Sequence, residues 1–70
     1  MNRVPVASSN LAEIGYSAET HTLEILFHSG HIYQYSDVTE SEFAALMNSS
    51  SKGRYFDQFI RYSHGTIQLR

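Results

Sequence analysis

The chain has 70 residues, no cysteine and a formal net charge of −2. A chain of this length builds one small hydrophobic core, and without cysteine it has no disulfide bond to support that core. No apolar run approaches the roughly 20 residues of a membrane span, and the short N-terminal run is broken by Pro5, which argues against a signal peptide. We therefore expect a single soluble, cytoplasmic domain over residues 1–70.

The first predicted strand runs from Leu11 to Ser17, after a ragged start over residues 1–8. Within the strand, Ile14 and Tyr16 share one face, because successive side chains of a strand point to opposite faces. Gly15 interrupts the strand, which indicates a bulge or the close approach of another element. A short polar connection then leads into residues 22–36, so that three antiparallel strands form a meander.

Residues 22–36 contain two alternating runs on either side of Ser29-Gly30, a pattern typical of a β-hairpin. With a two-residue loop, Tyr33 and Tyr35 lie on the face opposite Phe27 and form an open aromatic platform. With a three-residue loop, His28 to Gly30, Phe27 pairs with His31 and the tyrosines join the apolar face. We favour the three-residue loop, because it needs a positive φ that glycine tolerates.

Two helices are predicted after the hairpin. The first runs from Thr39 to Asn48, with Thr39 as N-cap and Glu42 three residues later, which together form a capping box. The second runs from Ser51 to Tyr62 and ends before His64-Gly65. Residues 66–70 alternate like a strand, but we expect this chain end to fray.

The predicted fold class is α+β, a three-stranded antiparallel β-meander followed by two short α-helices packed on one face. Apolar side chains of the hairpin form the buried face of the sheet, and apolar side chains of the helices cover it. The sheet side consists of Leu23, Ile25, Phe27, Tyr33 and Tyr35. The helix side consists of Phe43, Leu46, Phe56, Phe59 and Ile60.

The start of the second helix carries the strongest functional signal. Residues 1–50 contain six acidic side chains and one basic one, whereas residues 51–70 contain four basic and one acidic. Cations in the first turn oppose the helix dipole, and free N–H groups at such a turn favour phosphate or carboxylate. The candidate anion-binding or RNA-binding residues are Ser51, Lys52, Gly53, Arg54, Tyr55 and Arg61. The alternative interpretation is a solvated face, with Gly53 permitting a tight turn and Arg54 paired with Asp57.

Two further motifs do not support catalysis or metal binding. Residues 49–52 match the S-x-x-K pattern of penicillin-binding enzymes, but that chemistry needs further partners on a much larger scaffold. His28 and His31 have an H-x-x-H spacing, yet no cysteine or acidic residue of that loop completes a metal site. We therefore predict no catalytic residue, no metal and no cofactor.

With these residues in place, the chain resembles the KTSC domain family, small modules found alone and at the C-terminus of some lysyl-tRNA synthetases. The first matching segments are Ser8-Ser9, Ile14-Gly15-Tyr16, the alternation from Leu23 to Tyr35 around Gly30, and Val38. The match closes with Ser51-Lys52-Gly53-Arg54-Tyr55-Phe56 and Ile60-Arg61. Thr39 stands where the family often has proline, and Asp57 where it often has asparagine. The acidic Asp57 lies beside Arg54 and Arg61 in the sequence and weakens the anion-binding interpretation.

The resemblance implies no established activity, and at most an accessory role in RNA binding or protein docking. From the aromatic content, the acidic net charge and the lack of catalytic groups, we predict a small interaction module that docks a protein partner or a second copy of itself. The alternative is an accessory domain that binds RNA, tRNA or a nucleotide phosphate through the basic start of the second helix.

Overall fold

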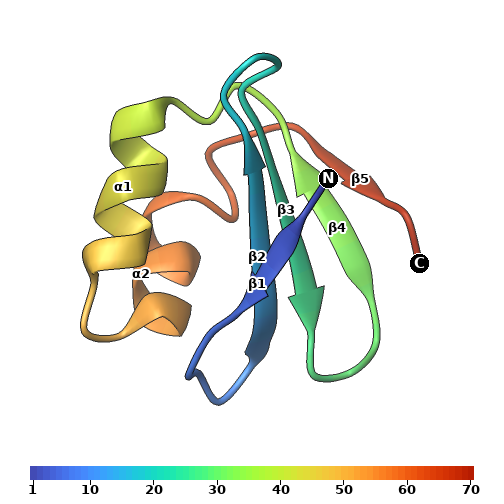
Figure 1. The fold of residues 1–70 in the computed structure, drawn as a ribbon, viewed down its shortest axis with the longest axis vertical. Helices are drawn as coiled ribbons and strands as arrows, with labels where there is room; N and C mark the ends of the chain where they lie inside the picture. The colour runs from blue at the N-terminus through green and yellow to red at the C-terminus, as the bar shows by residue number, and fades with distance from the viewer.

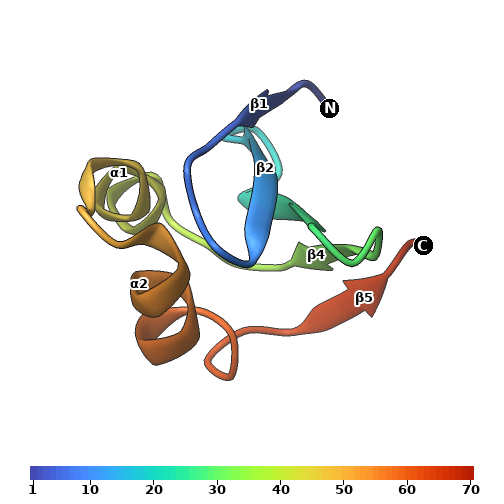
Figure 2. The ribbon, with the colours of Figure 1, turned by 90° about the horizontal axis from the view of Figure 1, so that it is seen from below.

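The computed structural model describes all residues from 1 to 70 as one antiparallel sheet and two helices (Figure 1). The strands are β1 (Arg3–Pro5), β2 (Leu11–Ser17), β3 (Thr22–Phe27), β4 (Ile32–Tyr35) and β5 (Thr66–Gln68). The helices are α1 (Glu40–Asn48) and α2 (Lys52–Phe59). The strands lie in the order β1-β2-β3-β4-β5, and the sheet curves so that both helices lie on one side of it (Figure 2). Neither helix is long and apolar enough to cross a membrane.

The α+β class is confirmed, but the sheet has five strands where the sequence predicted three. Both segments that we expected to fray form edge strands. Val4 pairs with Ile14 of β2, and Gln68 pairs with Tyr33 of β4. Each added strand has three residues, too few to show a period of two, and each is held by backbone hydrogen bonds to the edge of the meander.

The three-residue loop of the central hairpin is confirmed. The Phe27 N–H donates to the His31 carbonyl at 2.9 Å, and Ile25 faces Tyr33 across the ladder. Gly30 has a φ of 97°, the left-handed conformation that closes this loop. Tyr33 therefore shares the face of Phe27, and the two rings meet edge to face with centroids 5.8 Å apart.

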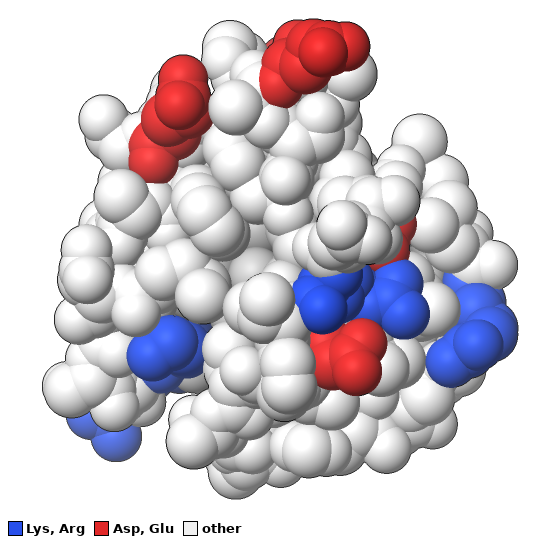
Figure 3. Space-filling view, in the orientation of Figure 1, with Lys and Arg blue, Asp and Glu red and all other residues white.

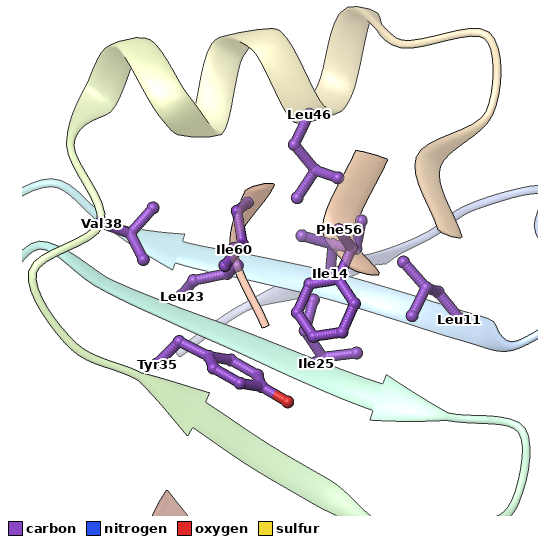
Figure 4. Close-up of a cluster of buried hydrophobic side chains, with 9 residues drawn as sticks. All are labelled: Leu11, Ile14, Leu23, Ile25, Tyr35, Val38, Leu46, Phe56 and Ile60. Atoms are coloured by element: carbon purple, nitrogen blue, oxygen red, sulfur yellow. The ribbon is translucent and has the colours of Figure 1, made fainter. Parts of the chain in front are cut away.

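The core lies between the sheet and the helices (Figure 4). The buried side chains are Leu11, Ile14, Leu23, Ile25, Tyr35, Val38, Leu46, Phe56 and Ile60. Phe27, Tyr33 and Phe43 are half-buried and pack against this cluster. Burial raises the pKa of Tyr35 to about 12, so its hydroxyl stays protonated at neutral pH.

The prediction that Phe59 belongs to the core is wrong, since its side chain is 54% exposed. Phe56 and Ile60, four residues apart, point into the core and define the buried face of α2. Phe59 lies to one side of that face, and its ring contacts Tyr55 with centroids 4.8 Å apart. The helix also ends at Phe59 rather than at Tyr62, so residues 60–63 form turns.

The two helices begin differently. At α1 the predicted capping box is confirmed: the Glu42 N–H donates to Thr39 Oγ1 at 3.2 Å, and the Thr39 N–H donates to Glu42 Oε1 at 3.0 Å. At α2 the N-cap residue Ser51 makes no side-chain capping bond. The first N–H groups of α2 therefore lack the acceptor that a capping side chain normally supplies.

Candidate functional site

The candidate residues at the start of α2 line a polar hollow of about 340 Å³. The hollow lies between this helix start and the loop that precedes β2. Apart from Ala7 and Gly53, the lining residues are polar or charged. They are Ala7, Ser8, Ser9, Asn10, Ser50, Ser51, Lys52, Gly53, Arg54 and Asp57. Of the predicted set, Ser51, Lys52, Gly53 and Arg54 thus come together, whereas Tyr55 and Arg61 do not line this hollow.

Gly53 allows a close approach, but the group that approaches it belongs to the chain itself. A Cβ at this position would collide with Asn10 Oδ1 and would lie 3.1 Å from Ser8 Oγ. The loop of residues 8–10 is in turn fastened to the β3–β4 turn. The His28 N–H donates to the Asn10 carbonyl at 3.0 Å, and His28 Nε2 lies 2.9 Å from the Ser8 carbonyl oxygen. The wall opposite the helix start is therefore held in place.

The two cations of the first turn differ in their freedom. Lys52 is half-buried, and its ammonium donates to the Ser49 carbonyl at 3.2 Å, which satisfies one of the last carbonyls near the end of α1. Arg54 is exposed and forms no ion pair with Asp57, contrary to the alternative that we left open. Arg54 is thus the freer of the two cations, while the Lys52 ammonium keeps two further N–H donors for an anionic ligand.

Asp57 pairs with Arg61, one helical turn further on, at 2.8 Å. Burial disfavours the charged guanidinium, but the hydrogen bond to Asp57 and the attraction of its negative charge together outweigh burial and raise the pKa of Arg61. The Arg61 guanidinium also lies 5.9 Å from the ring centroids of both Phe27 and Phe56. The negative charge of Asp57 is therefore largely balanced by Arg61, which reduces the repulsion that the carboxylate would exert on an anion.

Arg61 belongs to a second hollow, of about 460 Å³, which sequence reasoning missed. It is lined by Ser9, Asn10, Phe27, His28, Ser29, His31, Tyr33 and Arg61. Ser9 and Asn10 line both hollows, so the two adjoin along this loop. The sequence shows the two motifs that meet here, Ser8-Ser9 and Ser51-x-Gly53, as separate segments. Only the folded chain brings them into contact.

The charged side chains are unevenly distributed over the face shown in Figure 3. In this view acidic side chains gather at the upper end, over the β2–β3 turn and the start of α1. Basic side chains lie lower, at the start of α2 and over β1, and over β1 acidic side chains lie against them. The polar hollow thus has two cations, Lys52 and Arg54, and one acidic residue, Asp57, on its walls.

Nowhere in the chain do three or more histidine, cysteine or acidic side chains come together as metal ligands would. His28 and His31 each place one ring nitrogen against a backbone carbonyl, of Ser8 at 2.9 Å and of Arg70 at 3.2 Å. These contacts give both imidazoles a structural role at the hairpin turn.

Comparison with known proteins identifies relatives of the whole chain. The family model of the KTSC domain matches residues 7–63. An uncharacterised protein of Stutzerimonas stutzeri is 39% identical over 91% of this chain and 90% of its own length. The crystal structure of a KTSC domain protein from Yersinia pestis superposes with a TM-score of 0.95 at 36% identity, covering 99% of this chain and 97% of the other.

A lysine–tRNA ligase of Nostoc punctiforme is 40% identical over 53 residues, which are 76% of this chain and 9% of the ligase. A lysine–tRNA ligase of Trichormus variabilis matches to the same extent. The chain therefore spans a small part of these ligases.

Proposed function

The chain belongs to the KTSC domain family, and from that premise we propose that it is a non-catalytic accessory domain that binds single-stranded RNA at the start of α2. The observation that carries the proposal is the polar hollow in which Lys52 and Arg54 face a fixed, hydroxyl-rich loop. Phosphate oxygens accept hydrogen bonds from cationic side chains, serine hydroxyls and free backbone N–H groups, and this hollow offers all three.

Two further features support RNA as the ligand. The related lysine–tRNA ligases carry this module within enzymes whose name specifies a tRNA substrate. In addition, the adjoining hollow combines aromatic rings with Arg61, and proteins that bind single strands combine cations with aromatic side chains in this way. The net charge of −2 does not by itself oppose the proposal, because Glu13 and Glu24 are paired with Arg3, and Asp57 is paired with Arg61.

The test is a fluorescence-anisotropy titration of the full chain with a labelled single-stranded RNA of about 12 nucleotides, repeated at several salt concentrations. Each phosphate contact to a single strand contributes about 0.7 to the slope of log K against log salt, so Lys52→Ala with Arg54→Ala should reduce that slope by about 1.4. Arg70→Ala is the control for loss of a positive charge, because Arg70 lines neither hollow. No binding at low salt, or an equal loss with Arg70→Ala, would contradict the proposal.

A second candidate function is docking of a protein, and the exposed aromatic residues of α2 favour it. Phe59 is 54% exposed and Tyr62 86% exposed, and Tyr55 lies against Phe59. Exposed aromatic residues are enriched at protein interfaces. If this face docks a second copy, light scattering coupled to size exclusion should give twice the monomer mass, and Phe59→Ala should restore the monomer. A monomer at all concentrations would rule out self-association through this face.

A further inference from the structure

The second hollow differs from the polar one in the chemistry of its walls. Its volume of about 460 Å³ lies within the range of small-molecule sites. Phe27, Tyr33 and Arg61 contribute flat groups, and Asn10, His28 and His31 contribute hydrogen-bonding groups. Because Ser9 and Asn10 also line the polar hollow, the two hollows adjoin, and one extended ligand can contact both.

The aromatic rings of this hollow are held in a fixed arrangement. Phe27 meets both Tyr33 and Phe56 edge to face, each with centroids 5.8 Å apart. Tyr33 lies between His31 and Tyr35, with centroids 6.4 Å from each. Rings that are already ordered lose little conformational entropy when a ligand stacks on them.

Arg61 gives this hollow a cation that is already neutralised. Its guanidinium lies over Phe27 and Phe56, and Asp57 holds its orientation at 2.8 Å. A guanidinium in such a position offers a planar surface for stacking rather than a free charge for phosphate. The walls thus suit a flat, uncharged group better than they suit an anion.

Hydrogen-bonding groups on the walls can address the edge of such a group. His28 uses Nε2 and His31 uses Nδ1 for contacts within the chain, so His28 Nδ1 and His31 Nε2 have no partner there. Asn10 and Ser29 also line this hollow. Nucleobases combine a flat aromatic body with polar edges, which is the chemistry that these walls complement.

We propose that this hollow binds an unpaired nucleobase of the strand whose phosphates contact Lys52 and Arg54. The inference rests on the proposed function and deepens it, since it makes the ligand a single strand with an accessible base rather than a duplex. Phosphate contacts at the start of α2 then supply the charge-dependent part of the affinity. Stacking on Tyr33 and Arg61 supplies the part that depends on the base.

The experiment compares two labelled oligomers of equal length and charge, a single-stranded RNA and the same backbone without bases, with the full chain at fixed salt. Loss of stacking on one base should weaken binding of the abasic oligomer by about fivefold or more. Tyr33→Leu, which keeps an apolar side chain against the core, should reduce this preference toward unity. Lys52→Ala with Arg54→Ala should weaken the binding of both oligomers and leave the preference for the oligomer with bases unchanged.

The wild-type comparison alone decides the question if Tyr33→Leu proves unstable. Equal affinity of the wild-type chain for both oligomers would overturn the base site while leaving the phosphate site standing. Unchanged preference in a folded Tyr33→Leu variant would also overturn it. If the wild-type chain binds neither oligomer at low salt, the proposed function fails and the base site fails with it.

Discussion

Two carboxylates, Glu24 and Glu42, stay ionised although the fold removes much of their contact with water. Burial raises the pKa of each, but donated hydrogen bonds outweigh it and lower both values. For Glu24 the donors are Gln34 and Arg3, and for Glu42 they are Thr39 and His64. A carboxyl group with a folded-state pKa below its unfolded value stabilises the fold above the unfolded pKa, and this contribution is lost as the pH falls.

Glu42 permits a test of this coupling, since its Oε2 lies 2.8 Å from His64 Nε2 while Oε1 serves the capping box. We expect Glu42→Gln to cost about 0.5–1 kcal/mol of stability at pH 7, because glutamine can still accept the bond from the Thr39 N–H but lacks the negative charge that favours the helix N-terminus. Between about pH 5 and pH 3 the wild-type chain should lose stability more steeply than the variant, because only the wild type has this carboxylate to protonate. Urea denaturation at several pH values measures both, with the exposed Glu19→Gln as control. Parallel pH profiles of wild type and Glu42→Gln would contradict the account.

Gly15 makes room for the N-terminal segment on the face of the sheet that points away from the helices. A Cβ at Gly15 would lie 2.9 Å from both Arg3 Cγ and the Asn2 carbonyl oxygen. This space lets Arg3 lie across β2 and pair with Glu13, at 3.0 Å, and with Glu24. The interruption seen in the sequence is thus a close approach, while the irregularity in register falls between Leu11 and Glu13.

We expect Gly15→Ala to destabilise the chain by about 1–3 kcal/mol, the usual cost of overpacking, because β1 has to move away from β2. Thermal denaturation measures the loss. In a chain that lacks residues 1–4 the same substitution should cost much less, since the groups that crowd Gly15 are gone. An equal cost in both backgrounds would show that Gly15 serves some purpose other than the seating of β1.

At the scale of the element, α2 divides its aromatic residues between the core and the surface. Phe56 is fully buried among Tyr35, Phe27 and the sheet, whereas Phe59, three residues later, is mainly exposed. The two phenylalanines therefore form a matched pair on one helix, with the same side chain in opposite environments.

Phe56→Ala should cost about 3–5 kcal/mol and Phe59→Ala less than about 0.5 kcal/mol. A core of this size supplies a net stability of only about 3–5 kcal/mol, so the first variant should be largely unfolded at room temperature. Circular dichroism with urea denaturation distinguishes the two variants. Similar losses for both would mean that α2 is rotated relative to the sheet.

For the whole molecule, side-chain alternation predicted the central hairpin, and the capping box predicted α1. The parity of Phe27, Tyr33 and Tyr35 about Gly30 left two registers, and the requirement for a common apolar face selected the observed one. The edge strands β1 and β5 escaped prediction because three residues show no period and their pairing depends on the rest of the sheet. Phe59 was misplaced because its spacing from Phe56 suits either flank of a helical stripe.

The candidate site was predictable in part. The cations of α2 stood out because they oppose the helix dipole, and Gly53 beside them stood out because it allows a close approach to the backbone. The loop of residues 8–10 and the aromatic hollow did not, because they arise where distant segments meet: Asn10 on Gly53, and Arg61 on Phe27. No local pattern encodes such contacts.

The most direct test of the RNA-binding surface is a map of backbone amide shifts of the isotope-labelled chain, titrated with a single-stranded RNA at low salt. The account predicts that shifts concentrate in three segments: residues 8–10, the β3–β4 turn and residues 51–54. The proposed surface would be contradicted by shifts confined to Tyr55, Phe59 and Tyr62, or by shifts confined to the outer face of the sheet. The absence of any shift would contradict it as well.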